Sequence, residues 1–288
     1  MRPARMNAGP GPVVLVAHGS RDPRAAAETR ALVRAVELAR PGLPVRASYL
    51  DHAGPRPGQV LHDLAAAGHP YATVVPLLLT AAYHGRVDIP GAIATARAEG
   101  LQMPVRVTDV LGPATVSDPP DELLLTALCR RLTESGAFAG SDVFAGSDGL
   151  AGPCAFAGSG AVGGFDRHAA VRVDAVVLAA AGTRDADARR GVEGVAGALR
   201  ELLGVPCVAA YASAAPPTAG AVVERLRAAG ARRIAVAAYF LAPGRLYGAS
   251  VASARAAGAA TVAEPLTDAP ELARLVLRRA DAPIPARV

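Results

Sequence analysis

Two histidines and one aspartate in this 288-residue chain have the types and spacing to hold a divalent metal ion. His18, Asp51 and His84 are separated by 33 residues each, and each follows an apolar run. Two imidazoles and a carboxylate suit Co²⁺, Ni²⁺, Fe²⁺ or Zn²⁺ and leave coordination positions open for a substrate. His52 is an alternative ligand to its neighbour Asp51. The competing interpretation is that these side chains are solvated or satisfy backbone groups in turns.

The spacing of these residues matches one strand and one helix per step. Apolar runs at 13–16, 45–50 and 72–79 predict strands, and Asp22 followed by Pro23 is typical of the start of a helix. Alternating strands and helices predict a doubly wound parallel sheet, in which ligands bind beyond the carboxyl ends of the strands. We therefore expect all three side chains to converge at that edge.

The second half of the chain repeats the first at an offset of about 162 residues. LVAHGSRDPRA from Leu15 aligns with LAAAGTRDADA from Leu178, and VVPLLL from Val74 aligns with VAAYFL from Val236. Repeats in one register predict an internal duplication, with two tandem doubly wound parallel-sheet domains at 11–134 and 172–282.

The chemistry of the two copies has diverged. Ala181 stands where the first copy has His18, and Leu246 or Tyr247 stands where it has His84. Five of the six histidines lie in the first copy, so we expect the activity there. Residues 135–171 contain FAGSD twice and FAGSG once, and this composition predicts a flexible Gly/Ala/Ser-rich linker that is dispensable for folding.

Composition narrows the class of partner. The formal charge of +5 favours an anionic small molecule as partner, although every one of the 30 basic residues is arginine, which lowers the value of any single arginine as a signal. Basic runs interleaved with aromatics are absent, so we expect no nucleic acid partner. The apolar runs fall well short of the roughly 18 residues of a membrane span, so we expect no membrane partner. The apolar run near the N-terminus is too short for a signal sequence, so we expect a cytoplasmic location.

Three stretches resemble the class II tetrapyrrole chelatases, the sirohydrochlorin cobalto- and ferrochelatases of CbiX and SirB type. They are VLVAHGSRDPRA from Val14, the strand end at Tyr49 to Asp51, and VVPLLLTAAYHGRVDIPGAI from Val74. The resemblance extends over both halves apart from the linker, and LAPGRL from Leu241 resembles the degenerate C-terminal copy of two-domain members. It implies insertion of Co²⁺ or Fe²⁺, or else Ni²⁺, into sirohydrochlorin for siroheme or cobalamin synthesis.

The resemblance implies that His18 and His84 bind the metal and perform catalysis. A glutamate commonly ends the second strand in the family, and here Asp51, one methylene shorter, takes the place of that metal ligand. The residues that we expect to contact the macrocycle are Ser20, Arg21, Tyr83 and Arg86.

The chemistry of the substrate fits these residue types. Sirohydrochlorin carries eight carboxylates, which Arg21, Arg86 and Arg245 could bind through forked hydrogen bonds, although ordinary surface arginines are the equal alternative. A neutral imidazole can release a weakly held metal and accept a pyrrole proton. We expect no cofactor beyond the divalent metal substrate, and a monomer whose two copies form an internal pseudo-dimer.

Two other functions compete with this interpretation. A histidine phosphohydrolase would need an arginine directly before the strand-end histidine, and Ala17 occupies that position. A metal carrier or tetrapyrrole-binding protein without turnover is the alternative that sequence leaves open. Loss of the histidines from one copy favours a single asymmetric active site over either.

Overall fold

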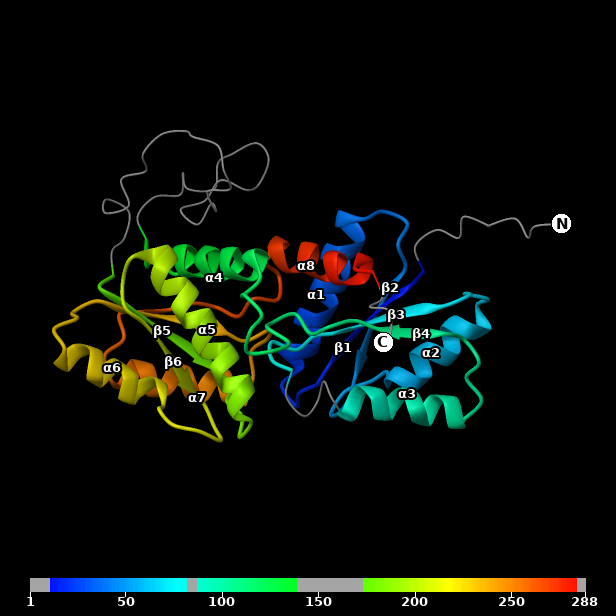
Figure 1. Ribbon diagram of the computed structural model, residues 1–288, viewed down its shortest axis with the longest axis horizontal. Helices are drawn as coiled ribbons and strands as arrows, with labels where there is room; N and C mark the ends of the chain where they lie inside the picture. Colours follow the sequence, from blue (N-terminus) through cyan, green and yellow to red (C-terminus); the bar gives the residue numbers. More distant parts are fainter. Residues whose placement is uncertain (1–10, 82–86, 139–172, 284–288) are drawn as a thin grey trace.

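The computed structural model describes residues 11–81, 87–138 and 173–283 and shows two α/β lobes side by side (Figure 1). The strands of the first lobe are β1 (Val13–Ala17), β2 (Val45–Tyr49), β3 (Ala72–Pro76) and β4 (Val105–Val107). The strands of the second lobe are β5 (Ala175–Ala180), β6 (Cys207–Tyr211), β7 (Ile234–Tyr239) and β8 (Thr261–Val262). The linker expected at 135–171 lies almost entirely outside the described residues.

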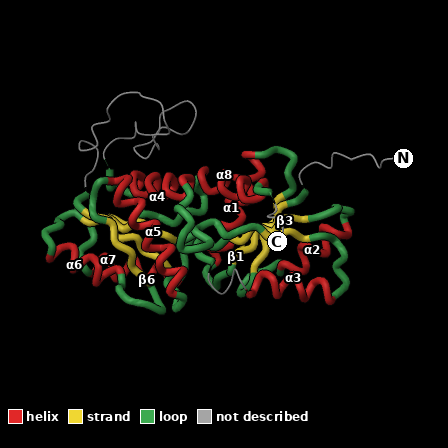
Figure 2. The backbone as a smooth tube through the Cα atoms, viewed as in Figure 1, coloured by secondary structure: helices red, strands yellow, loops and turns green. Residues whose placement is uncertain are grey.

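Helices cover both faces of each sheet (Figure 2). Those that follow the strands of the first lobe in sequence are α1 (Pro23–Ala39), α2 (Pro57–Ala66), α3 (Ile89–Ala98) and α4 (Glu122–Glu134). Those that follow the strands of the second lobe are α5 (Ala186–Leu203), α6 (Ala219–Ala228), α7 (Arg245–Ala256) and α8 (Pro270–Asp281). None of the helices in the described part of the chain is long and apolar enough to span a membrane.

All described strand pairs are parallel, in the orders β2-β1-β3-β4 and β6-β5-β7-β8. The central strands β1, β3, β5 and β7 are almost wholly buried, because helices cover both faces of a parallel sheet and select continuous apolar runs. The order reverses beside β1, so the crevice at the carboxyl ends of β1 and β3 is a topological switch point. The predicted fold class, two parallel α/β sheets related by duplication, is confirmed.

The duplication extends to single hydrogen bonds. The hydroxyl of Tyr49 at the end of β2 donates to the carbonyl of Ala26 at 3.4 Å, and the hydroxyl of Tyr211 at the end of β6 donates to the carbonyl of Arg189 at 3.3 Å. Each tyrosine thus holds the first turn of a helix against the strand edge of its own lobe. The edges where we expect ligands are therefore built in the same way in both lobes.

The lobes exchange one helix each. Helix α4 follows β4 but packs against β7 and α5 of the second lobe, and α8 follows β8 but packs against α1 and β3 of the first. The two exchanged helices also pack against each other. The sequence predicted two domains that end at residues 134 and 282, and these boundaries remain predictions. In the structure, each sheet is covered by a helix that follows the other sheet in the chain.

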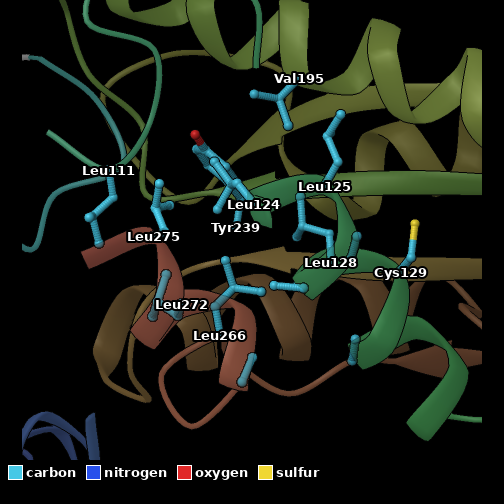
Figure 3. Close-up of a cluster of buried hydrophobic side chains, with 14 of the residues drawn as sticks. Leu111, Leu124, Leu125, Leu128, Cys129, Val195, Tyr239, Leu266, Leu272 and Leu275 are labelled. Atoms are coloured by element: carbon cyan, nitrogen blue, oxygen red, sulfur yellow. The ribbon is translucent and has the colours of Figure 1, made fainter. Parts of the chain in front are cut away.

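A continuous buried core results from this exchange (Figure 3). Leu124 and Leu128 of α4 pack with Tyr239 of β7, and Leu272 and Leu275 of α8 lie beside them. All five side chains are at most 3% exposed. Because the same cluster serves both sheets, its burial stabilises the two lobes together rather than separately.

One ion pair is buried where α4 meets α8. Arg130 donates from Nε and Nη2 to both carboxylate oxygens of Glu271 at 2.5 to 3.1 Å, and the Glu271 side chain is only 3% exposed. The carboxylate raises the pKa of the Arg130 guanidinium above its usual value, so the guanidinium is charged at neutral pH. A second pair on α8, between Arg40 and Asp281, is much more exposed, with 53% of the Asp281 side chain accessible.

Removing one partner of the buried pair should destabilise both lobes. We expect Glu271→Ala to lower the free energy of unfolding by about 3 kcal/mol, because the partly buried guanidinium of Arg130 loses the buried carboxylate that accepts its hydrogen bonds. Asp281→Ala on the same helix should cost at most about 1 kcal/mol, because its pair is solvent-screened. Denaturant unfolding of the three proteins measures both changes, and equal losses would contradict the structural role of the buried pair.

Candidate functional site

A cleft of about 1150 Å³ lies between the carboxyl ends of the two sheets. Its first wall comes from the loops after β1 and β3 and the start of α1, and its second wall comes from the loops after β5 and β7. Ligand cavities in proteins commonly measure about 300 to 1000 Å³, so this cleft can take a large organic ligand. It is also where switch-point topology places ligands in doubly wound sheets.

His18 stands at the end of β1, on the cleft wall and exposed. Its carbonyl accepts the backbone N–H of Asp51 at 2.8 Å, which ties the loop after β1 to the loop after β2. Gly19 makes this approach possible. Its φ of 94° is left-handed, and a Cβ at this position would lie 1.8 Å from the carbonyl oxygen of Asp51.

Ser20 and Arg21 also line the cleft, as the sequence analysis expected. The hydroxyl of Ser20 accepts the backbone N–H of Asp22 at 3.1 Å, and Asp22 in turn caps α1 by accepting the N–H of Arg24 at 3.0 Å. The Ser20 oxygen therefore has a structural partner in the turn. A contact of Ser20 with a ligand stays a prediction.

Asp51 lies in the loop after β2, and its role as a metal ligand stays a prediction. It follows β2, but it is not among the described residues that form the cleft wall, whereas its neighbour His52 is. The carboxylate Oδ1 accepts the backbone N–H of His52 at 2.8 Å. This bond, followed by the electrostatic influence of His52, Arg56 and His18, holds the pKa of Asp51 below its usual range. Asp51 is therefore an ionised carboxylate beside the histidines.

Two histidines line the cleft within the described residues. The ring centres of His18 and His52 are 6.4 Å apart and the rings are nearly perpendicular, at 85°. Tyr83, His84 and Arg86, the other predicted site residues, lie outside the described residues, so the expected meeting of His18 with His84 stays a prediction. Among residues 11–81, 87–138 and 173–283, no group of three or more His, Cys, Asp or Glu side chains could hold a metal ion.

The charges on the cleft wall are predominantly positive. Arg21 from the first lobe and Arg245 from the second both line the cleft and have no ion pair within the described residues. Asp22, the described acidic residue of the wall, is paired with Arg24 at 2.7 Å. Unpaired guanidinium groups on opposite walls suit an anionic ligand with several carboxylates.

The second lobe contributes wall residues that sequence reasoning did not identify. Thr183, Tyr239 and Tyr247 line the cleft. Tyr239 bridges the lobes, because its hydroxyl donates to the carbonyl of Leu79 at 2.9 Å, and burial raises its pKa above the usual range. Thr183 could have been identified from the sequence, because the repeat aligns Thr183 with Ser20. Nothing in the sequence marks Tyr239 as a contact between the lobes.

A model of the CbiX family matches residues 12–135 and 175–282. Solved structures with a similar fold include SirB from Bacillus subtilis with Fe³⁺ (TM-score 0.69, 20% identity, 93% of this chain and 92% of that chain). They also include the cobalt complex of the sirohydrochlorin chelatase SirB from Bacillus subtilis subspecies spizizenii (0.67, 19%, 93% and 92%). CbiX, described as the terminal enzyme of siroheme biosynthesis in denitrifying bacteria, is a third (0.60, 18%, 95% and 99%).

At these identities the structural matches establish the fold. Curated proteins give no significant sequence match to the chain. The family match spans both lobes and stops on either side of the segment between them, which is where the duplication places its boundary.

The loop contact at Gly19 can be tested against its counterpart in the second lobe. Gly182 also has a left-handed φ, of 90°, and a Cβ there would lie 2.0 Å from the carbonyl oxygen of Ser213. We expect Gly19→Ala and Gly182→Ala each to cost about 2 kcal/mol of stability, because both introduce strain and a backbone clash. Denaturant unfolding measures these losses.

Only Gly19→Ala should also weaken binding of Co²⁺, because it separates the His18 turn from the loop of Asp51 and His52. Calorimetric titration of both variants with Co²⁺ distinguishes them. Equal affinities for Co²⁺ would show that the geometry of the first-lobe loops does not matter for metal binding.

Proposed function

The chain belongs to the CbiX family, and we propose that it inserts a divalent metal ion into sirohydrochlorin. The observation that carries the proposal is the composition of the cleft wall. Histidines of the first lobe line a space large enough for a macrocycle, together with arginines of both lobes that have no ion-pair partner in the described part of the chain. The SirB structures with cobalt and with Fe³⁺ support a metal as substrate.

The reaction exchanges two protons for one metal ion. The free-base tetrapyrrole loses two pyrrole N–H protons and its four nitrogens receive M²⁺, so the chain must hold the metal weakly and accept protons. Imidazole does both, since it binds borderline metals and titrates close to neutral pH. We assign these roles to His18 and to His84, with the ionised Asp51 near His18 to favour the positively charged metal.

The arginines of the cleft orient the macrocycle in this proposal. Arg21 lies next to the His18 turn and Arg245 lies at the first position of α7 on the opposite wall, so forked hydrogen bonds to peripheral carboxylates would fix the ring between the lobes. Ser20, Tyr83 and Arg86 complete the proposed contacts. The duplication supplies both walls within one chain, so the proposal needs neither a second subunit nor a cofactor besides the metal.

The ligand atoms of the proposed site distinguish only coarsely between divalent metal ions. Nitrogen and carboxylate ligands accept Co²⁺, Fe²⁺ and Ni²⁺, and selection among these ions depends largely on their availability. With iron the product would serve siroheme synthesis, and with cobalt it would serve cobalamin synthesis, both in the cytoplasm. We favour Co²⁺ or Fe²⁺ over Ni²⁺, in line with the metals in the SirB structures.

His18→Ala should abolish most of the catalysed insertion without unfolding the chain. We expect a fall of about 100-fold or more in the rate, because the variant lacks a metal ligand and a proton acceptor. Thermal unfolding should be unchanged, since His18 is exposed. The rate is followed by the absorption change of sirohydrochlorin with Co²⁺ or Fe²⁺, corrected for spontaneous insertion.

The matched control is Ala181→His, which places an imidazole at the equivalent strand end of the second lobe. It should leave the rate unchanged, because the second lobe lacks the other site residues. If the wild-type protein adds nothing to the spontaneous rate with Co²⁺, Fe²⁺ or Ni²⁺, the chelatase proposal is wrong and a metal carrier or tetrapyrrole-binding protein replaces it.

A further inference from the structure

We propose that His52 is a metal ligand of the cleft beside His18, and that Asp51 acts as a positioning residue that holds His52 rather than as a ligand itself. This assignment rests on the proposed function only in taking a divalent metal ion as the substrate. It changes the donor set expected from sequence, in which Asp51 provided the third ligand.

The first argument is that His52 lines the cleft and Asp51 does not. His52 contributes to the cleft wall together with His18, whereas Asp51 does not. The Asp51 carboxylate is instead occupied beside the wall. Its Oδ1 accepts the backbone N–H of His52 at 2.8 Å and lies 3.7 Å from Nη2 of Arg56. Its Oδ2 lies 3.4 Å from Nε2 of His52.

The second argument is the backbone of the loop after β2. His52 has φ 58°, in the left-handed region that side-chain-bearing residues rarely occupy. Ala214, its counterpart after β6, has φ 64°, and both loops are held by matching backbone bonds, from Ala53 to Asp51 at 2.7 Å and from Ala215 to Ser213 at 2.8 Å. The left-handed turn therefore belongs to the duplicated fold.

The imidazole at this turn is particular to the first lobe. Alanine stands at both equivalent places of the second lobe, at Ala181 and at Ala214, whereas the first lobe has His18 and His52. The two histidines differ together between copies that otherwise share the turn geometry. A purely structural role in the loop would not require an imidazole, since alanine fills the same turn.

The third argument is distance. A metal–nitrogen bond of about 2.1 Å places an ion about 3.2 Å from the centre of an imidazole ring. One ion can therefore lie between rings whose centres are 6.4 Å apart, and a small rotation of either side chain bends the arrangement towards a tetrahedral angle. Both side chains can make that rotation, since His18 is exposed and 32% of the His52 side chain is accessible.

The position of Asp51 then has a chemical role. Metal-binding histidines commonly direct their second nitrogen at a carboxylate, which fixes the ring and raises its basicity. The carboxylate beside Nε2 of His52 leaves Nδ1 for the metal. Imidazole ligands without a direct carboxylate favour Co²⁺, Ni²⁺ and Fe²⁺ over oxygen-preferring Mg²⁺, and leave coordination positions to water and substrate.

The test is a calorimetric titration of the full chain with Co²⁺ in the absence of tetrapyrrole, so that its result does not depend on chelatase activity. His52→Asn suits the left-handed backbone and removes the imidazole, and we expect it to weaken Co²⁺ binding about 10-fold or more. Asp51→Asn keeps an acceptor for the N–H of His52 but loses the negative charge, and should weaken binding about 10-fold. His62→Asn on α2, away from the cleft wall, should bind as the wild type does.

The double variant Asp51→Asn with His52→Asn separates a positioning residue from a ligand. If Asp51 acts through His52, the double variant binds Co²⁺ no more weakly than His52→Asn alone. A further loss of about 10-fold in the double variant would make Asp51 a ligand in its own right and overturn the assignment. Wild-type affinity in His52→Asn, or no Co²⁺ binding by the wild-type protein, would also overturn it.

Discussion

The reciprocal exchange of α4 and α8 is the constraint on which the rest of the structure depends. Each helix covers the sheet of the other lobe, and the two meet at the buried pair of Arg130 and Glu271. The apolar cluster around Leu128 and Leu272 then fixes the lobes so that the carboxyl edges of both sheets face one cleft. The packing that sets the position of the cleft lies on one face of each sheet. Helices α2, α3, α6 and α7 cover the other faces.

Duplication provides the frame of the site and divergence provides its chemistry. Gly19 and Gly182 make the same close approach to a carbonyl, and the turns that contain His52 and Ala214 have the same backbone conformation. The fold therefore requires these turns with or without a ligand. In the first lobe these turns carry two histidines that line the cleft. In the second lobe alanine stands at the same places, and that wall of the cleft carries Tyr239, Tyr247 and Arg245.

Sequence patterns predicted the elements because local rules govern them. Continuous apolar runs predicted the parallel strands, and the repeated registers predicted the duplication. The position of His18 at the end of a strand predicted its place at the carboxyl edge of the sheet. The helix exchange could not be predicted, because the apolar face of α8 does not say which sheet it covers. The respective directions of Asp51 and His52 depend on a φ of 58°, which no residue pattern of this loop specifies.

The helix exchange also affects how the chain can fold as it leaves the ribosome. The helix that covers β3 and α1 of the first lobe is α8, and it is synthesised after the whole second sheet. The first lobe therefore emerges with one sheet face covered only in part, by α1, and the apolar side chains around β3 depend on contacts of very long sequence separation, which form slowly. An N-terminal fragment that carries His18 and His52 would accordingly lack the helix that covers β3 in the full chain, and the surroundings of the cleft loops are complete only once both halves of the chain have been made.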